Sequence, residues 1–182
     1  MRMFLMTLVL FVPLFRPPSA IAQKELPRFT EEREVAARFF VKKHLPELLP
    51  FLDLLKQNNF AQYQKQISEI FRVSEMLADI AHEKRVYELE LEIWKTENRS
   101  HLLVARMATS PEEERKLFEK QLLELAKKLV ALDVEVLELK EEQLEDELNT
   151  VRDQLSRMRQ DSEQHVRDRY ERLLEKARRL HR

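Results

Sequence analysis

Glycine and cysteine are both absent from this chain of 182 residues, and each absence removes a class of chemistry. Phosphate-binding loops, nucleophile elbows and dinucleotide fingerprints need glycine because the backbone must approach a ligand closely. Without cysteine the chain has no disulfide, no thiol nucleophile and no site for a lipid anchor on sulfur. We therefore expect no enzymatic activity, and we assign no catalytic, cofactor-binding or metal-ligating residue.

Long apolar runs are also scarce, because the only one extends from Met3 to Phe15. It is followed by RPPSAIAQ, in which Ala20 and Ala22 frame a small-x-small cleavage site. Thirteen apolar residues fall short of the roughly 20 that cross a bilayer as a helix. We predict a cleaved signal peptide at 1–22, with a retained membrane anchor as the alternative. The expected location is periplasmic or secreted, and the lack of cysteine favours a bacterial periplasm.

Charge of neither sign dominates, since 32 Lys and Arg stand against 33 Asp and Glu, so we expect no nucleic-acid partner. The charges are nevertheless segregated, because 138–147 is strongly acidic and 151–182 is rich in Lys and Arg. The basic end could make weak contact with an anionic surface. Alternatively, it forms pairs four residues apart that stabilise a helix: Glu163/Arg167, Asp168/Arg172 and Glu175/Arg179.

Turn-forming residues are missing from two long stretches, 59–108 and 111–180, and apolar residues recur there every three or four positions. This spacing places them on one helix face, so we predict one long helix in each stretch. Counted along the second stretch, the mean step is near 3.6, apart from jumps of eight residues at 136 to 144 and 158 to 166. We expect a fairly straight pair, with the jumps marking phase adjustments or a change of contacting helix.

A single proline, Pro111, separates the two long stretches. Ser110 suits an N-cap, Pro111 the first helical position and Glu113 the third, which together predict a capping box. The turn at about 108–111 is so short that the two helices should lie antiparallel. Residues whose numbers sum to about 219 should then face each other, leaving an overhang from 161 onward.

Two short helices are expected before the hairpin, within 23–57. Thr30 should cap the first, and Pro46 and Pro50 should interrupt the run before a second at about 47–57. We expect both to pack near the open end of the hairpin, where they would cover part of the overhang: Val166, Tyr170, Leu173 and Leu174. The predicted fold is all-α, with a long antiparallel two-helix hairpin, coiled-coil-like, formed by 58–182.

Two groups of side chains could in principle form a binding site. Trp94, with Tyr87, Leu91, Leu102, Met76 and Met107, has helical spacing that favours the hairpin interface over a recognition patch. Among the histidines, HEKRV at 82–86 has Val86 where a zinc-protease helix needs its second histidine. Asp79 and His82 form only one of the two pairs that a di-iron bundle requires. Neither group predicts a metal site.

The function expected from these features is that of an exported, non-catalytic scaffold or protein-interaction protein of the cell envelope. Apolar doublets at 122/123, 129/130 and 136/137 should leave apolar surface beside the hairpin interface. That surface predicts a protein partner or self-association through helix faces. One alternative is a periplasmic holdase that binds unfolded clients on the same surface. Another is a metal-sensing helical protein that uses His82.

Overall fold

A computed structural model describes residues 26–180, with the side chain of Leu180 excepted, and helices are the only regular secondary structure within this range. The predicted signal peptide at 1–22 lies outside the described residues. Six α-helices and one 3-10 helix follow in order: α1 (Glu31–His44), η1 (Pro46–Leu48), α2 (Leu49–Asn58), α3 (Phe60–Asp79), α4 (Lys84–Thr109), α5 (Glu112–Gln160) and α6 (Ser162–Leu180). The prediction of an all-α fold with a long hairpin is confirmed.

The N-terminal helices α1 and α2 pack against α3, and together they enclose the main core. Thr30 caps α1 as predicted, since its hydroxyl accepts a hydrogen bond from the backbone N–H of Arg33 at 3.3 Å. Pro46 begins η1, and Pro50 lies in the first turn of α2, where a missing N–H costs nothing. The fully buried side chains of this core come from three helices and one connection: Ala37, Val41, Leu45, Leu52, Tyr63 and Ile67.

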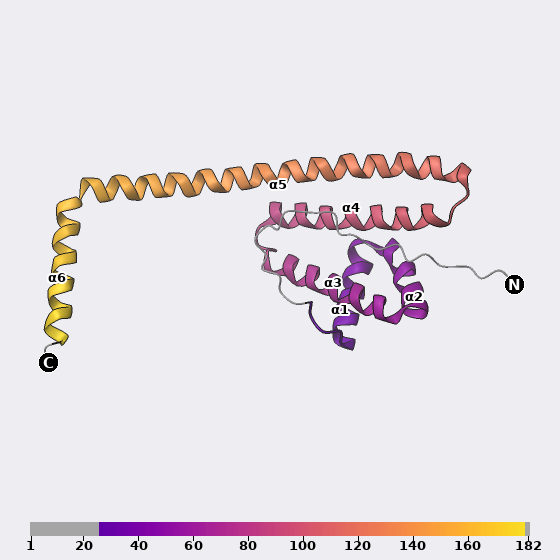
Figure 1. Ribbon diagram of the computed structural model, residues 1–182, viewed down its shortest axis with the longest axis horizontal. Helices are drawn as coiled ribbons and strands as arrows, with labels where there is room; N and C mark the ends of the chain where they lie inside the picture. Colours follow the sequence, from indigo (N-terminus) through magenta and orange to yellow (C-terminus); the bar gives the residue numbers. More distant parts are fainter. Residues whose placement is uncertain (1–25, 181–182) are drawn as a thin grey trace.

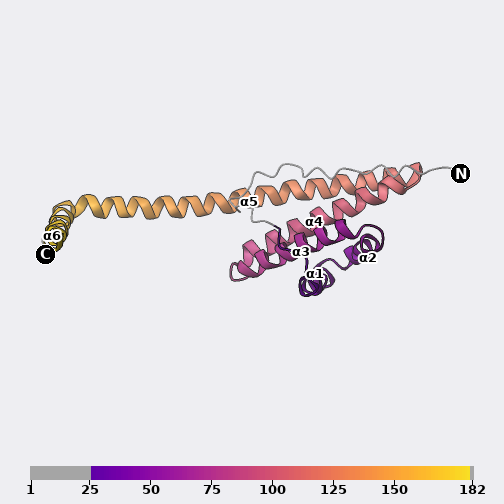
Figure 2. The same cartoon turned by 60° about the horizontal axis from the view of Figure 1, so that its bottom comes forward.

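The prediction of one helix over 59–108 is wrong, because the chain turns at 80–83 between α3 and α4. Neither proline nor glycine marks this turn, and no described residue has a positive φ. Ile80 ends α3 with φ −96° and ψ 10°, and its backbone N–H bonds back to Met76 and Ala78. Figures 1 and 2 show that α3 returns beneath α4, so the first arm of the hairpin is α4 alone.

The hairpin itself is formed by α4 and α5, which lie side by side and run antiparallel on either side of the turn near residue 110 (Figure 1). Lys128 binds the carboxylate of Glu92 across this interface, and the two numbers sum to 220. The predicted pairing rule therefore holds in this part of the hairpin. The predicted capping box does not form, because α5 begins at Glu112 with Pro111 as its N-cap and no side chain caps it.

Beyond the start of α4 the second arm continues without a neighbour among the described residues (Figure 1). A single helix over 111–180 was predicted, but α5 ends at Gln160 and α6 leaves at a steep angle after Asp161. The N-terminal helices pack against α3 and α4, so they do not cover the overhang. Its predicted contact residues are exposed: Val166, Tyr170, Leu173 and Leu174. That part of the prediction is wrong.

Candidate interaction surface on α5

One row of side chains on α5 faces α4, and we call it the inner row. Leu132 is its only buried member and packs with Leu89 and Ile93 of α4. The other members are partly buried: Phe118, Leu122, Leu125, Leu129, Val136 and Leu139. Their steps alternate between four and three residues, which keeps them on one helix face. The inner row is the apolar surface that holds the hairpin together.

A second apolar row on α5 is exposed, and we call it the outer row. Its members are Leu123, Val130, Val134, Leu137, Leu144, Leu148, Val151, Leu155 and Met158. All nine fit a single seven-residue repeat, because each is separated from its neighbours by three, four or seven residues. Leu137 and Val130, for example, expose 65% and 63% of their surface. Such a long exposed row is unusual for a soluble helix that has no further partner.

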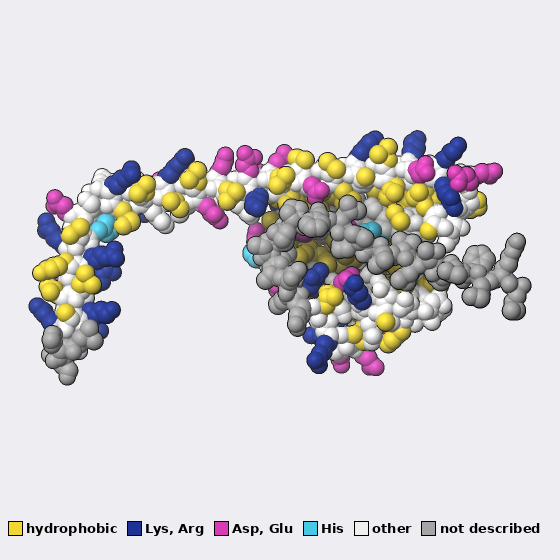
Figure 3. Space-filling model, viewed as in Figure 1, with side chains coloured by type: hydrophobic (Ala, Val, Ile, Leu, Met, Phe, Trp, Pro, Cys, Tyr) yellow, Lys and Arg dark blue, Asp and Glu magenta, His cyan; other side chains and the backbone are white. Residues whose placement is uncertain are grey.

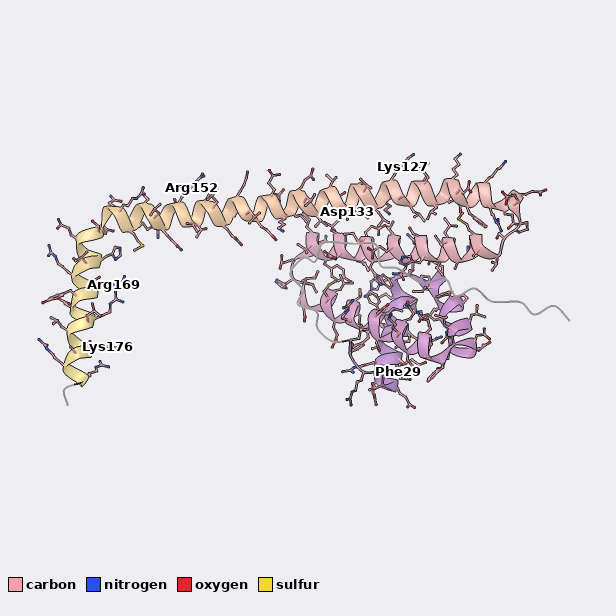
Figure 4. All side chains as sticks on the ribbon, in the orientation of Figure 1. Phe29, Lys127, Asp133, Arg152, Arg169 and Lys176 are labelled. Carbon is pink, nitrogen blue, oxygen red and sulfur yellow. The ribbon has the colours of Figure 1, made fainter. Side chains whose placement is uncertain are left out.

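The two rows lie on nearly opposite sides of α5. At 100° per residue, the centres of the inner and outer rows over the stretch that they share are separated by roughly 140° around the helix axis. Figure 4 agrees, since Lys127, which has the phase of the outer row, lies on the side of α5 away from α4. The outer row therefore cannot be covered by α4. Any helix that covers it must approach from the opposite side.

The inner and outer rows differ in composition beyond the point where α5 passes the start of α4. Arg85, near the start of α4, binds Glu142 at 2.8 Å, so the hairpin contact stops close to this point. The positions that continue the inner row are then polar: Gln143, Asp146, Thr150, Asp153, Arg157 and Gln160. The outer row stays apolar through Met158. Apolar residues thus persist only on the face that α4 never covers.

Sequence reasoning found the doublets but missed the outer row, because it followed one stripe through both rows. Each predicted doublet contributes one residue to each row, and the exposed members are Leu123, Val130 and Leu137. The jump from 136 to 144 is a passage from the inner row to the outer row. The jump from 158 to 166 spans the break between α5 and α6. Taken separately, each row repeats every 3.5 residues, the period typical of a left-handed supercoil.

Apolar side chains also gather on α6, although they do not continue the outer row. Val166, Tyr170 and Leu173 are exposed, and their spacing of four and three residues places them on one side of α6. Figure 3 shows hydrophobic and basic side chains next to each other along this helix. Two of the three expected ion pairs form here, with Arg167 3.7 Å from Glu163 and Arg179 2.5 Å from Glu175. From residue 140 to 179 every side chain is exposed. Residues 140–179 therefore form a long exposed surface that carries apolar rows and ion pairs.

Trp94 and its neighbours do not form the hairpin interface as predicted. Trp94 is buried on the other face of α4, where its ring lies 4.8 Å from that of Phe40. Four of the five residues grouped with it pack against the same core: Met76, Tyr87, Leu91 and Leu102. The α4 residues that meet α5 are instead Leu89 and Ile93. α4 thus has two apolar faces, one for each layer that it separates.

A polar cluster joins α1, α2 and α3 at the edge of the main core. Tyr63 donates a hydrogen bond to Oε1 of Glu34 at 2.5 Å, and Lys56 Nζ lies 2.5 Å from the same oxygen. Burial of the carboxylate by itself would raise the pKa of Glu34, but the hydrogen bonds from Lys56 and Tyr63 outweigh it and lower this pKa. The polar groups of Glu34, Lys56 and Tyr63 bind one another, so we interpret this cluster as a structural network.

A shallow groove between α4 and α5 near the hairpin turn combines an apolar floor with charged edges. Leu103, Leu117 and Leu125 contribute apolar surface to the groove. Two of its basic side chains are already bound, Arg99 to Glu47 at 2.8 Å and Lys128 to Glu92. Half of the groove's basic side chains are therefore already engaged within the protein.

The histidines within residues 26–180 come from different parts of the fold: His44 from α1, His82 from the turn before α4, His101 from α4 and His165 from α6. His82 is exposed in the turn between α3 and α4, with its Nε2 3.4 Å from the carboxylate of Glu83. Burial lowers the pKa of His101, and burial together with Lys43 and Lys95 lowers that of His44. No group of three metal-binding side chains occurs within residues 26–180. The same range contains no helix with both the length and the hydropathy needed to cross a membrane.

Comparison with known proteins adds no relationship to this picture. The chain matches no protein-family model, and neither curated proteins nor solved structures show significant similarity to it.

Proposed function

We propose that this chain is an exported, non-catalytic helical-hairpin scaffold of the cell envelope that binds a partner helix along the outer row of α5. The observation that carries the proposal is the outer row itself, which has nine exposed apolar members, interrupted by Lys127 and Glu141, on the side of α5 away from α4. A seven-residue apolar repeat is the pattern by which one helix recognises another. The folded body, α1 to α4, would hold one end of α5 and present the rest to the partner.

The proposal is tested by photo-crosslinking in the intact cell envelope. A photoreactive amino acid at Leu148 lies in the outer row, and the same group at Thr150 lies on the polar continuation of the inner row. We expect strong protein crosslinks from position 148 and weak ones from position 150. Equal crosslinking at the two positions, or none at either, would contradict a partner on the outer row.

A holdase that binds unfolded proteins is the second candidate function. It is favoured by exposed apolar residues that lie off the outer row, including Leu117 near the hairpin turn and Tyr170 on α6. Such a protein should suppress aggregation of an unrelated denatured protein at near-stoichiometric amounts. The absence of suppression would leave helix pairing as the better account, because a strict seven-residue repeat is not needed to bind a disordered client.

A further inference from the structure

We propose that the helix covering the outer row between residues 141 and 158 belongs to a second copy of this chain, and that the two α5 helices pair antiparallel in one register. This inference rests on the proposed function, because it names the occupant of the outer row. Residues whose numbers sum to about 299 would lie opposite each other in adjacent core layers. The twofold axis would then pass between Asn149 and Thr150, in the middle of the overhanging part of α5.

Charge segregation along α5 is the first reason for a second copy in this orientation. Residues 138–147 carry six carboxylates and one lysine, whereas 152–159 carries three arginines and one aspartate. All of these side chains are exposed or lie at the edge of the hairpin, and past residue 142 no other helix of the described residues lies beside them. An antiparallel pair places the acidic segment of each copy beside the basic segment of the other. Opposite charges then attract at both ends of the contact.

The apolar core supports the same register. Leu144 would lie opposite Leu155 of the second copy, and Leu148 opposite Val151. Symmetry repeats both layers, so four consecutive layers at the centre contain only Leu and Val. These side chains expose about half of their surface in the single chain, and pairing would remove that apolar area from water.

The residues that flank the outer row select between neighbouring registers. In antiparallel pairs, flanking positions of the same kind meet across the interface. In the proposed register Glu145 meets Arg152 of the second copy, Glu138 meets Arg159, and on the other flank Lys140 meets Asp161. A shift of seven residues in one direction places Glu145 beside its own counterpart. The opposite shift does the same to Arg152, and like charges at such positions repel.

A parallel pair fits the sequence less well. Glu141 has the phase of the outer row, so a parallel, in-register pair would bury it against Glu141 of the second copy. In the antiparallel register it lies opposite Met158, near the guanidinium of Arg159. Two carboxylates facing each other in an apolar core are strongly unfavourable. The parallel arrangement would also place Asp133 beside Glu138.

Engineered cysteines test the register in the full chain, because the protein contains no cysteine of its own. Two variants, Leu144→Cys and Leu155→Cys, are prepared with tags of different size and mixed under mild oxidation. In the proposed pair these positions face each other, whereas two copies of residue 144 are about 16 Å apart along the axis. That distance is too long for a disulfide. We expect mixed disulfides to form at least about tenfold faster than either symmetric disulfide.

The control for the cysteine test is Thr150→Cys, which lies near the axis but on the face turned away from the outer row. It should give little disulfide in any register. Faster symmetric linkage of Leu144→Cys would show a parallel pair, overturning this inference while leaving the proposed function intact. If disulfide yields were no higher than in the control and sedimentation showed a monomer, the proposal that a second copy covers the outer row would be wrong. Crosslinking from position 148 would still decide the proposed function independently.

Charge exchange provides a second test that leaves the apolar core unchanged. Glu145→Arg and Arg152→Glu should each weaken self-association about tenfold, because attractive contacts become repulsive at two symmetric sites. The double variant, E145R combined with R152E, restores attraction in the antiparallel pair and should recover most of the affinity. In a parallel pair it would not, since residue 145 would remain beside Lys140 and residue 152 beside Glu147. A double variant as weak as the single ones contradicts the inference.

Discussion

The rings of Phe40 in α1 and Trp94 in α4 meet edge to face, with their centroids 4.8 Å apart and their planes inclined at 60°. This contact joins the N-terminal helices to the first arm of the hairpin. It also explains why Trp94 faces away from α5. The base from which α5 projects is thus a four-helix body whose central packing includes an aromatic pair.

Removal of the Phe40 ring should destabilise this body. We expect Phe40→Ala to lower the free energy of unfolding by about 3 kcal/mol, because a nearly buried ring is lost from the core. The neighbouring Phe39 is 67% exposed, so Phe39→Ala should change the free energy of unfolding by less than about 0.5 kcal/mol. Trp94 is the only tryptophan, so urea unfolding followed by its fluorescence measures both variants. Equal losses would contradict the packing.

The turn between α3 and α4 shows where sequence reasoning failed. Apolar residues run at helical spacing through 60–94, and the only irregularity is the seven-residue step from Ile80 to Tyr87. The same stripe is compatible with one long helix or with two helices that share a core. The two-helix arrangement is favoured because it lets Tyr87 and Trp94 pack into the core that α1 and α3 form. That contact is tertiary, so no local propensity signals it.

Two capping residues give a matched test of local structure. Thr30 accepts a hydrogen bond from the backbone of α1, whereas Ser110 caps no helix with its side chain and contributes its backbone oxygen to Arg115 at 3.1 Å. We expect Thr30→Ala to cost about 1 kcal/mol and Ser110→Ala less than about 0.5 kcal/mol. Thermal unfolding followed by circular dichroism measures the difference. A larger loss of stability for Ser110→Ala than for Thr30→Ala would indicate that the capping box at Ser110 does form.

The cluster around Glu34 predicts a dependence of stability on pH. The folded state lowers the pKa of Glu34, so its carboxylate stabilises the protein above the unfolded-state pKa. This contribution is lost as the pH falls through the lowered value. We expect the stability difference between the wild type and Glu34→Gln to be constant near neutral pH and to shrink in acid. Urea unfolding across this range measures it.

A partial version of the same change serves as the control for the pH experiment. Tyr63→Phe removes one of the two hydrogen bonds to Glu34 and leaves Lys56 in place. Its pH dependence should therefore lie between those of the wild type and Glu34→Gln. If stability curves of the wild type and Glu34→Gln ran parallel down to acid pH, the carboxylate would not be held in its charged form by this cluster.

Much of the candidate surface was implicit in the sequence, because the doublets on α5 already indicated apolar residues on more than one face. What could not be read from the sequence was which member of each doublet faces α4. That depends on the rotation of α5 about its axis, which the contact of Leu132 with Leu89 and Ile93 fixes. The length of α4 determines how far the inner row is apolar, because the inner row has a helix to pack against only as far as the start of α4.

Two leucines of α5 separate the roles of its faces. Leu132 packs against α4 and is only 7% exposed, whereas Leu148 lies in the outer row beyond α4 and is 48% exposed. Leu132→Ala should lower the free energy of unfolding by about 2 kcal/mol, since it opens a cavity in the hairpin interface. Leu148→Ala should change the stability of the single chain by less than about 0.5 kcal/mol. Urea unfolding at low protein concentration measures both.

Self-association should respond in the opposite order. Leu148→Ala removes apolar area from the centre of the proposed pair in both copies, so it should weaken dimerisation at least about tenfold. At temperatures where the hairpin stays folded, Leu132→Ala leaves the outer row intact and should dimerise like the wild type. Sedimentation equilibrium over a range of concentrations measures both constants. If the Leu132→Ala chain lost dimerisation while the Leu148→Ala chain kept it, the inner row would be the face that binds the partner.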